Sequence, residues 1–462
     1  MTTVYEIEHL YQADGWLSPG YVEVGGDGII VRVSSEYTGD HNAVRLAGFG
    51  VPGLQNLHSH AFQRALVGRT EFVGHGRAED NLWNWREEMY RLVDRLTPDD
   101  VEAIAALVYL EMLQFGTTTL CEFQYLHHQP GGGFYENPAE MSERLIATAE
   151  RIGLRLTLLP VLYGHGGIGV PPQGAQLRFV HSVDDYLTLV QTLRLRCSSR
   201  PWLRIGLALH SLRAVTPDEA LTAVESMNTM DADANIHIHV SETVKEVADV
   251  ENALGARPVE WLLDNVDLNH KWCLVHATHL DASELAKAAK SGAVVGLCPL
   301  TEAMLGDGLF QLVEYHDAHG SWGIGTDSQC STSIAEELRV LECGKRLELR
   351  RRNVIARSVD GQKAHSGRIL FDSALAGGAR ASGQGAVALA PGEFADLVLL
   401  DPHCNTLLGH GPETVLDAWI LGGTHNPVRD VMVAGRWIIH DGRHAEEAAI
   451  RANYRTVIER VA

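Results

Sequence analysis

The chain has 462 residues, 45% of them hydrophobic and 21% charged, a composition typical of a globular protein with one large domain and a smaller one beside it. Its 38 Lys and Arg residues against 59 Asp and Glu residues give a formal net charge of −21, which argues against nucleic acid and anionic membranes as partners. Seven scattered cysteines without a C-x-x-C pair, and no apolar run near the ~20 residues of a membrane span, predict a cytoplasmic protein with reduced thiols.

The predicted elements change character near residue 51. Residues 1–50 alternate short apolar runs with Gly and Asp, which predicts strands of a small antiparallel sheet. Beyond them, apolar runs alternate with helical patterns, as in repeated βα units. We expect eight strands, at residues 51–57, 117–123, 156–162, 203–210, 236–240, 272–276, 294–298 and 322–327.

These eight units predict an α/β fold, a (β/α)8 TIM-like barrel over residues 51–383 that ends in a helix at about 366–383. Strand signals return at 394–401 and 428–439, the second with a tight Ala434-Gly435 turn. We expect residues 1–50 and 384–462 to pair into a small composite β-sandwich domain. One long insertion, residues 61–97, follows the first barrel strand and is rich in Trp and Arg.

Histidine and aspartate recur where the predicted barrel strands end, which is the edge where barrels carry their chemistry. His58 and His60 lie two residues apart, so strand alternation places both on one face. Alone, this pair is a weak signal of a metal site. The ends of other strands supply His239, His276 and Asp327. Imidazole nitrogens together with a carboxylate suit Zn²⁺, with Fe²⁺ and Mn²⁺ as alternatives.

These motifs resemble the metal-dependent amidohydrolase superfamily, in its branch with one divalent metal. Longer strings resemble its formimidoylglutamate deiminase family, which converts N-formimino-L-glutamate to N-formyl-L-glutamate and ammonia in histidine degradation. They are residues 56–65, 83–87, 210–215, 274–279 and 301–308. Gln124 and Met304 depart from that family's pattern.

The resemblance implies a role for each of several residues. The metal ligands would be His58, His60, His239 and Asp327, and the catalytic residues Glu242, His276 and Asp327. The residues binding the substrate would be Gln63, Arg86, Tyr125, His210 and Arg213. The small-molecule substrate carries carboxylates, which arginine binds with two parallel hydrogen bonds. A homodimer is usual for the relatives, so Arg86 could serve its own subunit or a neighbour's; it could also simply stack on Trp83 or Trp85.

Two other functions remain open at this point. The same metal site could deaminate a heterocyclic base of the guanine or cytosine type, but a neutral ring needs no carboxylate clamp such as Arg86 with Arg213. A non-catalytic scaffold would be expected to have lost a ligand or an acid, and this chain keeps the whole set.

Overall fold

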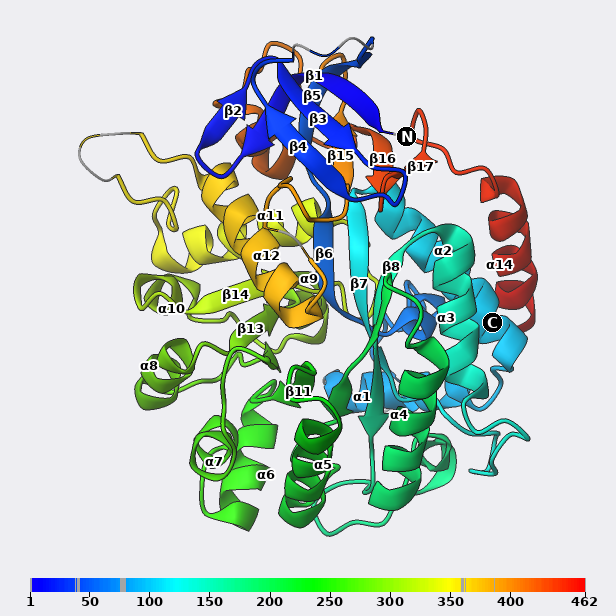
Figure 1. The fold of residues 1–462 in the computed structure, drawn as a ribbon. Helices are drawn as coiled ribbons and strands as arrows, with labels where there is room; N and C mark the ends of the chain where they lie inside the picture. The colour runs from blue at the N-terminus through cyan, green and yellow to red at the C-terminus, as the bar shows by residue number, and fades with distance from the viewer. Residues whose placement is uncertain are drawn as a thin grey trace.

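The barrel dominates the computed structural model, which describes residues 2–37, 39, 42–74, 80–358, 361, 363–385 and 387–461. Its strands are parallel and follow the chain order around the barrel, from β6 to β14 (Figure 1). They are β6 (Leu54–Ser59), β7 (Thr117–Gln124), β8 (Arg155–Leu162), β9 (Leu203–Ile205), β10 (Leu207–Leu209), β11 (Ile236–Val240), β12 (Trp272–His276), β13 (Val294–Leu297) and β14 (Ser321–Ile324). The predicted (β/α)8 fold is confirmed, and two strands differ in detail. The fourth is split at Gly206 into β9 and β10, and the first begins at Leu54 because Val51 and Pro52 pair with the small sheet.

The barrel closes where the end of β6 meets the segment after β14. The amides of Thr326 and Asp327 both donate to the carbonyl of His58 at 3.0 Å, and the amide of His60 donates to the carbonyl of Asp327 at 3.0 Å. Gly325 permits this approach, because a Cβ there would lie 2.6 Å from the His58 Cβ. Closure therefore places the strand-one histidines directly against Asp327.

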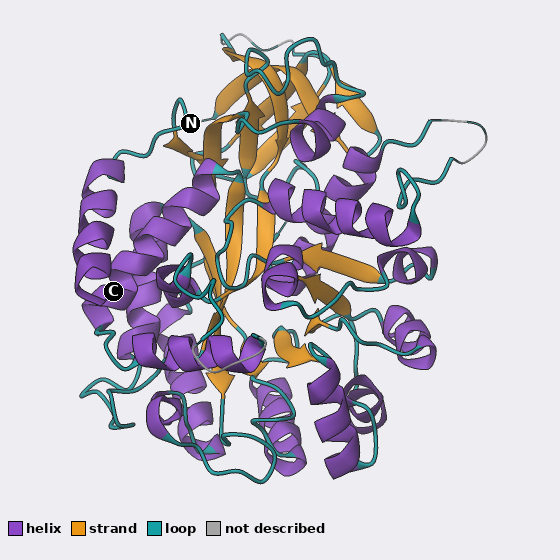
Figure 2. Cartoon of the chain, turned by 180° about the vertical axis from the view of Figure 1, so that it is seen from behind, coloured by secondary structure: helices purple, strands orange, loops and turns teal. Residues whose placement is uncertain are grey.

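Helices surround the strands on the outside (Figure 2). Several begin at a capping box that satisfies free backbone amides, as Thr97 with Asp100 does for α2 and Thr216 with Glu219 for α5. The helices are α1 (Leu82–Val93), α2 (Pro98–Gln114), α3 (Glu140–Ile152), α4 (Val183–Cys197), α5 (Pro217–Met230), α6 (Val244–Leu254), α7 (Pro258–Asn265), α8 (Ala282–Ser291), α9 (Pro299–Leu305), α10 (Leu312–Asp317), α11 (Ile334–Leu349), α12 (Ser366–Ser382), α13 (Val415–Asp417) and α14 (Glu447–Val461). Shorter 3-10 turns lie at Ala61–Leu66 and Gly174–Arg178, and a π turn at Ala418–Gly422.

The second sheet combines strands from both ends of the chain, as predicted (Figure 1, top). It comprises β1 (Thr3–Gln12), β2 (Gly15–Leu17), β3 (Gly20–Val24), β4 (Ile30–Ser34), β5 (Val44–Pro52), β15 (Leu397–Leu400), β16 (Val428–Val433) and β17 (Arg436–Ile439). β15 joins the two groups by pairing antiparallel with β5. The sheet also curls back on itself, because the amide of Ile30 donates to the carbonyl of Glu393 at 2.8 Å. Its halves enclose a small apolar core of their own.

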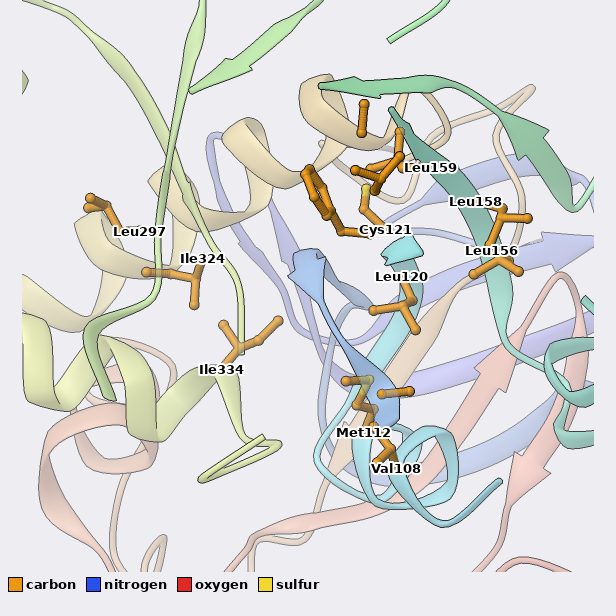
Figure 3. Close-up of a cluster of buried hydrophobic side chains, with 14 of the residues drawn as sticks. Val108, Met112, Leu120, Cys121, Leu156, Leu158, Leu159, Leu297, Ile324 and Ile334 are labelled. Carbon is orange, nitrogen blue, oxygen red and sulfur yellow. The ribbon is translucent and has the colours of Figure 1, made fainter. Parts of the chain in front are cut away.

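The main core lies between the barrel strands and their helices. Figure 3 shows part of it, with Val108 and Met112 of α2 near Leu120 of β7, all three fully buried. α12 packs so closely on β14 that a Cβ at Gly377 would lie 2.0 Å from the carbonyl oxygen of Trp322. Across the described residues, no helix is long and apolar enough to cross a membrane.

Candidate active site

Three histidine side chains converge at the carboxyl edge of the barrel. The Nε2 atom of His58 lies 3.2 Å from Nε2 of His60 and 3.0 Å from Nε2 of His239. Oδ1 of Asp327 lies 3.3 Å from Nε2 of His60 and 3.6 Å from Nε2 of His58. All four side chains are buried. The structure thus brings together the complete predicted ligand set.

The outward ring nitrogens of two histidines are held by backbone carbonyls. Nδ1 of His60 lies 2.9 Å from the carbonyl oxygen of Phe123, and Nδ1 of His239 lies 2.9 Å from that of His210. Since a carbonyl can only accept, each Nδ1 carries the proton and each Nε2 presents a lone pair to the centre. Burial lowers the pKa of His58 to about 3, and it lowers the pKa values of His60 and His239 as well.

These neutral rings fit a divalent cation. The lone pairs of His60 and His239 both face Nε2 of His58 at 3.0–3.2 Å, and a neutral His58 ring has only one proton and cannot satisfy both, whereas a cation among the three nitrogens satisfies all of them. The carboxylate of Asp327 would add an oxygen donor, and its neighbouring histidines hold its pKa below the ordinary value despite burial. Three nitrogens with one carboxylate are donors that suit Zn²⁺ and related metals.

His276 and Asp327 both adopt left-handed backbone conformations, with φ of 68° and 44°. A non-glycine residue in this region costs on the order of 1–3 kcal/mol, and such strain concentrates at functional sites. With these backbone conformations both side chains reach the site, where Nε2 of His276 lies 3.7 Å from Oδ2 of Asp327. The alternating strand pattern of the sequence carries no sign of these turns.

Carboxylates surround His276 on both ring nitrogens. Nδ1 lies 3.3 Å from Oε1 of Glu302, and Nε2 lies 3.9 Å from Oε1 of Glu242. Burial lowers the pKa of His276, but Glu242, Glu302 and Asp327 outweigh it and raise the value to about 10. Glu302 is itself fixed, because its Oε1 accepts from the amide of Cys298 at 2.9 Å. Sequence reasoning missed Glu302, which lies in the 301–308 string but carried no signal of its partner.

The two predicted arginines line the same cavity as the histidines, which has a volume of about 60 Å³. Arg213 lies 3.5 Å from Glu242 through Nη2 and is nearly buried. Arg86 lies in its own chain's cavity, stacks 5.0 Å from the Trp83 ring, and donates to the hydroxyl of Tyr90 at 2.5 Å. Stacking and a place in the cavity, stated above as rival interpretations, therefore occur together.

The neutral candidates complete the cavity wall. Gln63 donates to the hydroxyl of Tyr125 at 2.7 Å, and its buried Oε1 has no hydrogen-bond partner in the described structure. His210 packs edge-on against Tyr125 and lies beside His239. Gln124 turns away, donating to the carbonyl of Leu126 at 2.6 Å, and does not line the cavity. Residues that the sequence did not single out also line it, namely Leu82, Met89, Thr301 and Leu305.

A barrel with this metal-type site at its strand ends defines a class of metal-dependent hydrolases, and comparison with known families agrees. The model of the amidohydrolase family matches residues 49–438, so the chain belongs to the amidohydrolase family. Members of this family depend on metals, and the histidine cluster could hold one.

Two curated proteins and two solved structures illustrate what the chain is similar to within this fold. A formimidoylglutamate deiminase of Pseudomonas aeruginosa is 45% identical over 441 residues, covering 95% of each chain. An 8-oxoguanine deaminase of the same species is 28% identical and covers 85% of this chain and 82% of its own. Among solved structures, an amidohydrolase from Brucella melitensis superposes with a TM-score of 0.92 at 39% identity over 99% of both chains. An adenosine deaminase from Xanthomonas campestris with bound zinc has a TM-score of 0.81 at 22% identity over 99% and 98%, a likeness of fold.

Proposed function

We propose that the protein is a metal-dependent deiminase that hydrolyses N-formimino-L-glutamate to N-formyl-L-glutamate and ammonia. The observation that carries this proposal is the shared cavity, in which two arginines stand beside a histidine-aspartate metal centre. A linear dicarboxylate needs such cations in a chain of net charge −21, whereas a neutral heterocycle does not. The likeness to the Pseudomonas aeruginosa deiminase supports the same substrate.

In this proposal His58, His60, His239 and Asp327 hold one divalent metal. When bound there, the metal supplies a water whose pKa falls from ~15.7 to about 7. Zn²⁺ is our first choice because nitrogen donors dominate the set, with Fe²⁺ and Mn²⁺ as alternatives.

The residues around the metal position then divide the proton transfers. Asp327 takes a proton from the attacking water at its carboxylate. Glu242, beside Nε2 of His276 at 3.9 Å, passes a proton released by this water to the departing nitrogen, which leaves as ammonia. His276 donates from Nε2 to the oxygen of the attacking water, because its raised pKa keeps it protonated near pH 7, and so orients that oxygen and helps to stabilise the tetrahedral intermediate.

Recognition of the substrate falls to the cavity wall. Arg213 and Arg86 bind its carboxylates, while Gln63, Tyr125 and His210 hydrogen-bond the formimino group. The unpartnered Oε1 of Gln63 is an acceptor suited to an N–H of that group.

Product analysis tests the function. Zn²⁺-loaded protein is incubated with N-formimino-L-glutamate, ammonia is followed, and the organic product is identified. We expect N-formyl-L-glutamate with ammonia, lost in Asp327→Asn and kept in the exposed control Asp264→Asn. Formamide with glutamate would show that the other C–N bond is cut, and turnover of a purine or pyrimidine alone would overturn the substrate assignment.

We also propose a cytoplasmic homodimer. All seven cysteines lie in the described part of the chain and none is in a disulfide, which fits a reducing compartment. Size-exclusion chromatography with light scattering tests the dimer.

A further inference from the structure

A second, larger cavity adjoins the metal site. It has a volume of about 540 Å³, against about 60 Å³ for the inner one, and it shares Arg86 and Arg213 with it. The outer cavity falls in the range of ~300–1,000 Å³ that is usual for small-molecule sites, and the inner one falls below it. The two arginines therefore stand at the boundary between the outer space and the reacting centre.

Three cations surround one indole ring on the wall of this cavity. The guanidinium carbons of Arg86 and Arg213 lie 5.0 and 5.7 Å from the Trp83 ring centroid, and Nζ of Lys245 lies 5.4 Å from it. Lys245 is thus within about 11 Å of Arg213, the sum of two distances to a shared ring, which is about one Debye length in 0.1 M salt. Such a gathering of positive charge is notable in a chain of net charge −21.

The nearby carboxylates do not neutralise Lys245 firmly. Its partner is Asp249, at 2.6 Å, but both side chains are exposed, by 58% and 40%. Exposed ion pairs of this kind contribute about 0–1 kcal/mol, so an incoming carboxylate can compete. Arg213 faces Glu242 and Glu246 on its inner side. Lys245 is therefore the most solvent-exposed of the three cations around Trp83.

We propose that the outer cavity is the chamber through which the dicarboxylate substrate enters, with Lys245 as its outermost attracting charge. The two carboxylates of the substrate meet Lys245 at the Trp83 ring and pass to Arg213 and Arg86, which hold the substrate with its formimino group in the inner cavity. Nothing in the resemblance assigns Lys245, and the inference rests on the proposed function for the identity of the dicarboxylate.

Two substitutions test the chamber, one that removes a positive charge (Lys245→Met) and one that removes a negative charge (Asp249→Asn). Lys245→Met should lower kcat/KM for N-formimino-L-glutamate by up to about threefold at 10 mM ionic strength and up to about 1.5-fold at 0.15 M, the effect of two carboxylate charges about 10 Å away in water. Asp249→Asn should raise kcat/KM by a similar factor. The matched controls are Lys290→Met and Asp264→Asn, exposed positions that do not line either cavity and carry the same changes of charge.

Binding of glutarate, a dicarboxylate without a formimino group, tests the chamber independently of the proposed deiminase activity. If the wild-type protein does not turn over N-formimino-L-glutamate, the proposed function fails, while calorimetry with glutarate still tests the chamber. We expect weaker glutarate binding in Lys245→Met than in Lys290→Met, with a difference that fades in 1 M salt. Equal effects in these two variants, a difference that persists in 1 M salt, or changes of the same sign in Lys245→Met and Asp249→Asn would overturn it.

Discussion

Replacing Gly325 with alanine should disturb the proposed metal centre by pushing the segment of Asp327 away from the backbone of His58. The added Cβ would lie 2.6 Å from Cβ of His58, 2.9 Å from its carbonyl oxygen and 3.0 Å from its nitrogen. None of these atoms is the free end of a flexible side chain, so the two segments must separate. Overpacking of this kind costs about 1–3 kcal/mol. The segment that moves carries Asp327, whose amide is held to the carbonyl of His58 at 3.0 Å.

Two measurements on purified Gly325→Ala follow from this geometry. At about 2.1 cal/mol/K of unfolding entropy per residue, a cost of 1–3 kcal/mol lowers the melting temperature of a chain this long by only about 1–3 °C. Metal content should respond more strongly, because a ligand moves by tenths of an ångström, so we expect faster loss of metal to a chelator.

The matched control is Gly133→Ala, where an added Cβ meets no atom within 4 Å and the backbone is not left-handed. That change should leave metal retention untouched and slightly favour folding, by about 0.4–1 kcal/mol, through the unfolded chain. If Gly325→Ala matches Gly133→Ala in melting temperature and metal retention, the close approach to His58 does not hold Asp327 in place.

Two further predictions concern buried histidines. Glu302→Gln keeps an acceptor beside Nδ1 of His276 but removes its charge, so the pKa of His276 should fall by about 1–3 units. The alkaline limb of kcat should then move to lower pH with KM little changed, and an unchanged profile would exclude a positioning role. His181 has both ring nitrogens buried without partners, and burial lowers its pKa to about 3. The unfolded chain binds a proton at His181 below about pH 6.5 and the folded chain does not, so this residue alone lowers the free energy of unfolding by up to about 2 kcal/mol by pH 5. Between pH 7.5 and 5, the free energy of unfolding in urea should therefore fall by about that much less in His181→Phe than in the wild type, and equal decreases would contradict the prediction.

The strand periodicity predicted most of what positions the site. Parallel strands bring their carboxyl ends to one edge, so residues as distant as His58 and His239 could be placed together from the sequence. The same reasoning put Val51 in the barrel, because an apolar run cannot indicate which sheet its backbone will join. In the structure Val51 pairs with Val398 of β15, a partner more than 300 residues away.

The supporting contacts could not be read from spacing. Glu122 accepts from the hydroxyl of Ser59 at 2.6 Å and from the amide of Ala61 at 2.7 Å, and so holds the turn that carries His60. The strand pattern of β7 predicts that this side chain is buried, but not that it meets Ser59 and Ala61. Such partners depend on which side chains the closed barrel brings within hydrogen-bond distance, and one sequence contains no record of that.

The charges of the site link recognition to catalysis. Arg213 is nearly buried and cannot lose its proton, so it requires a carboxylate partner in every state. Without substrate, Glu242 at 3.5 Å and Glu246 at 3.9 Å supply that charge. A substrate carboxylate on Arg213 would take over part of this role and leave Glu242 free to face His276 and the departing nitrogen. The arginine would then favour the dicarboxylate both by binding it and by releasing the acid that the reaction requires.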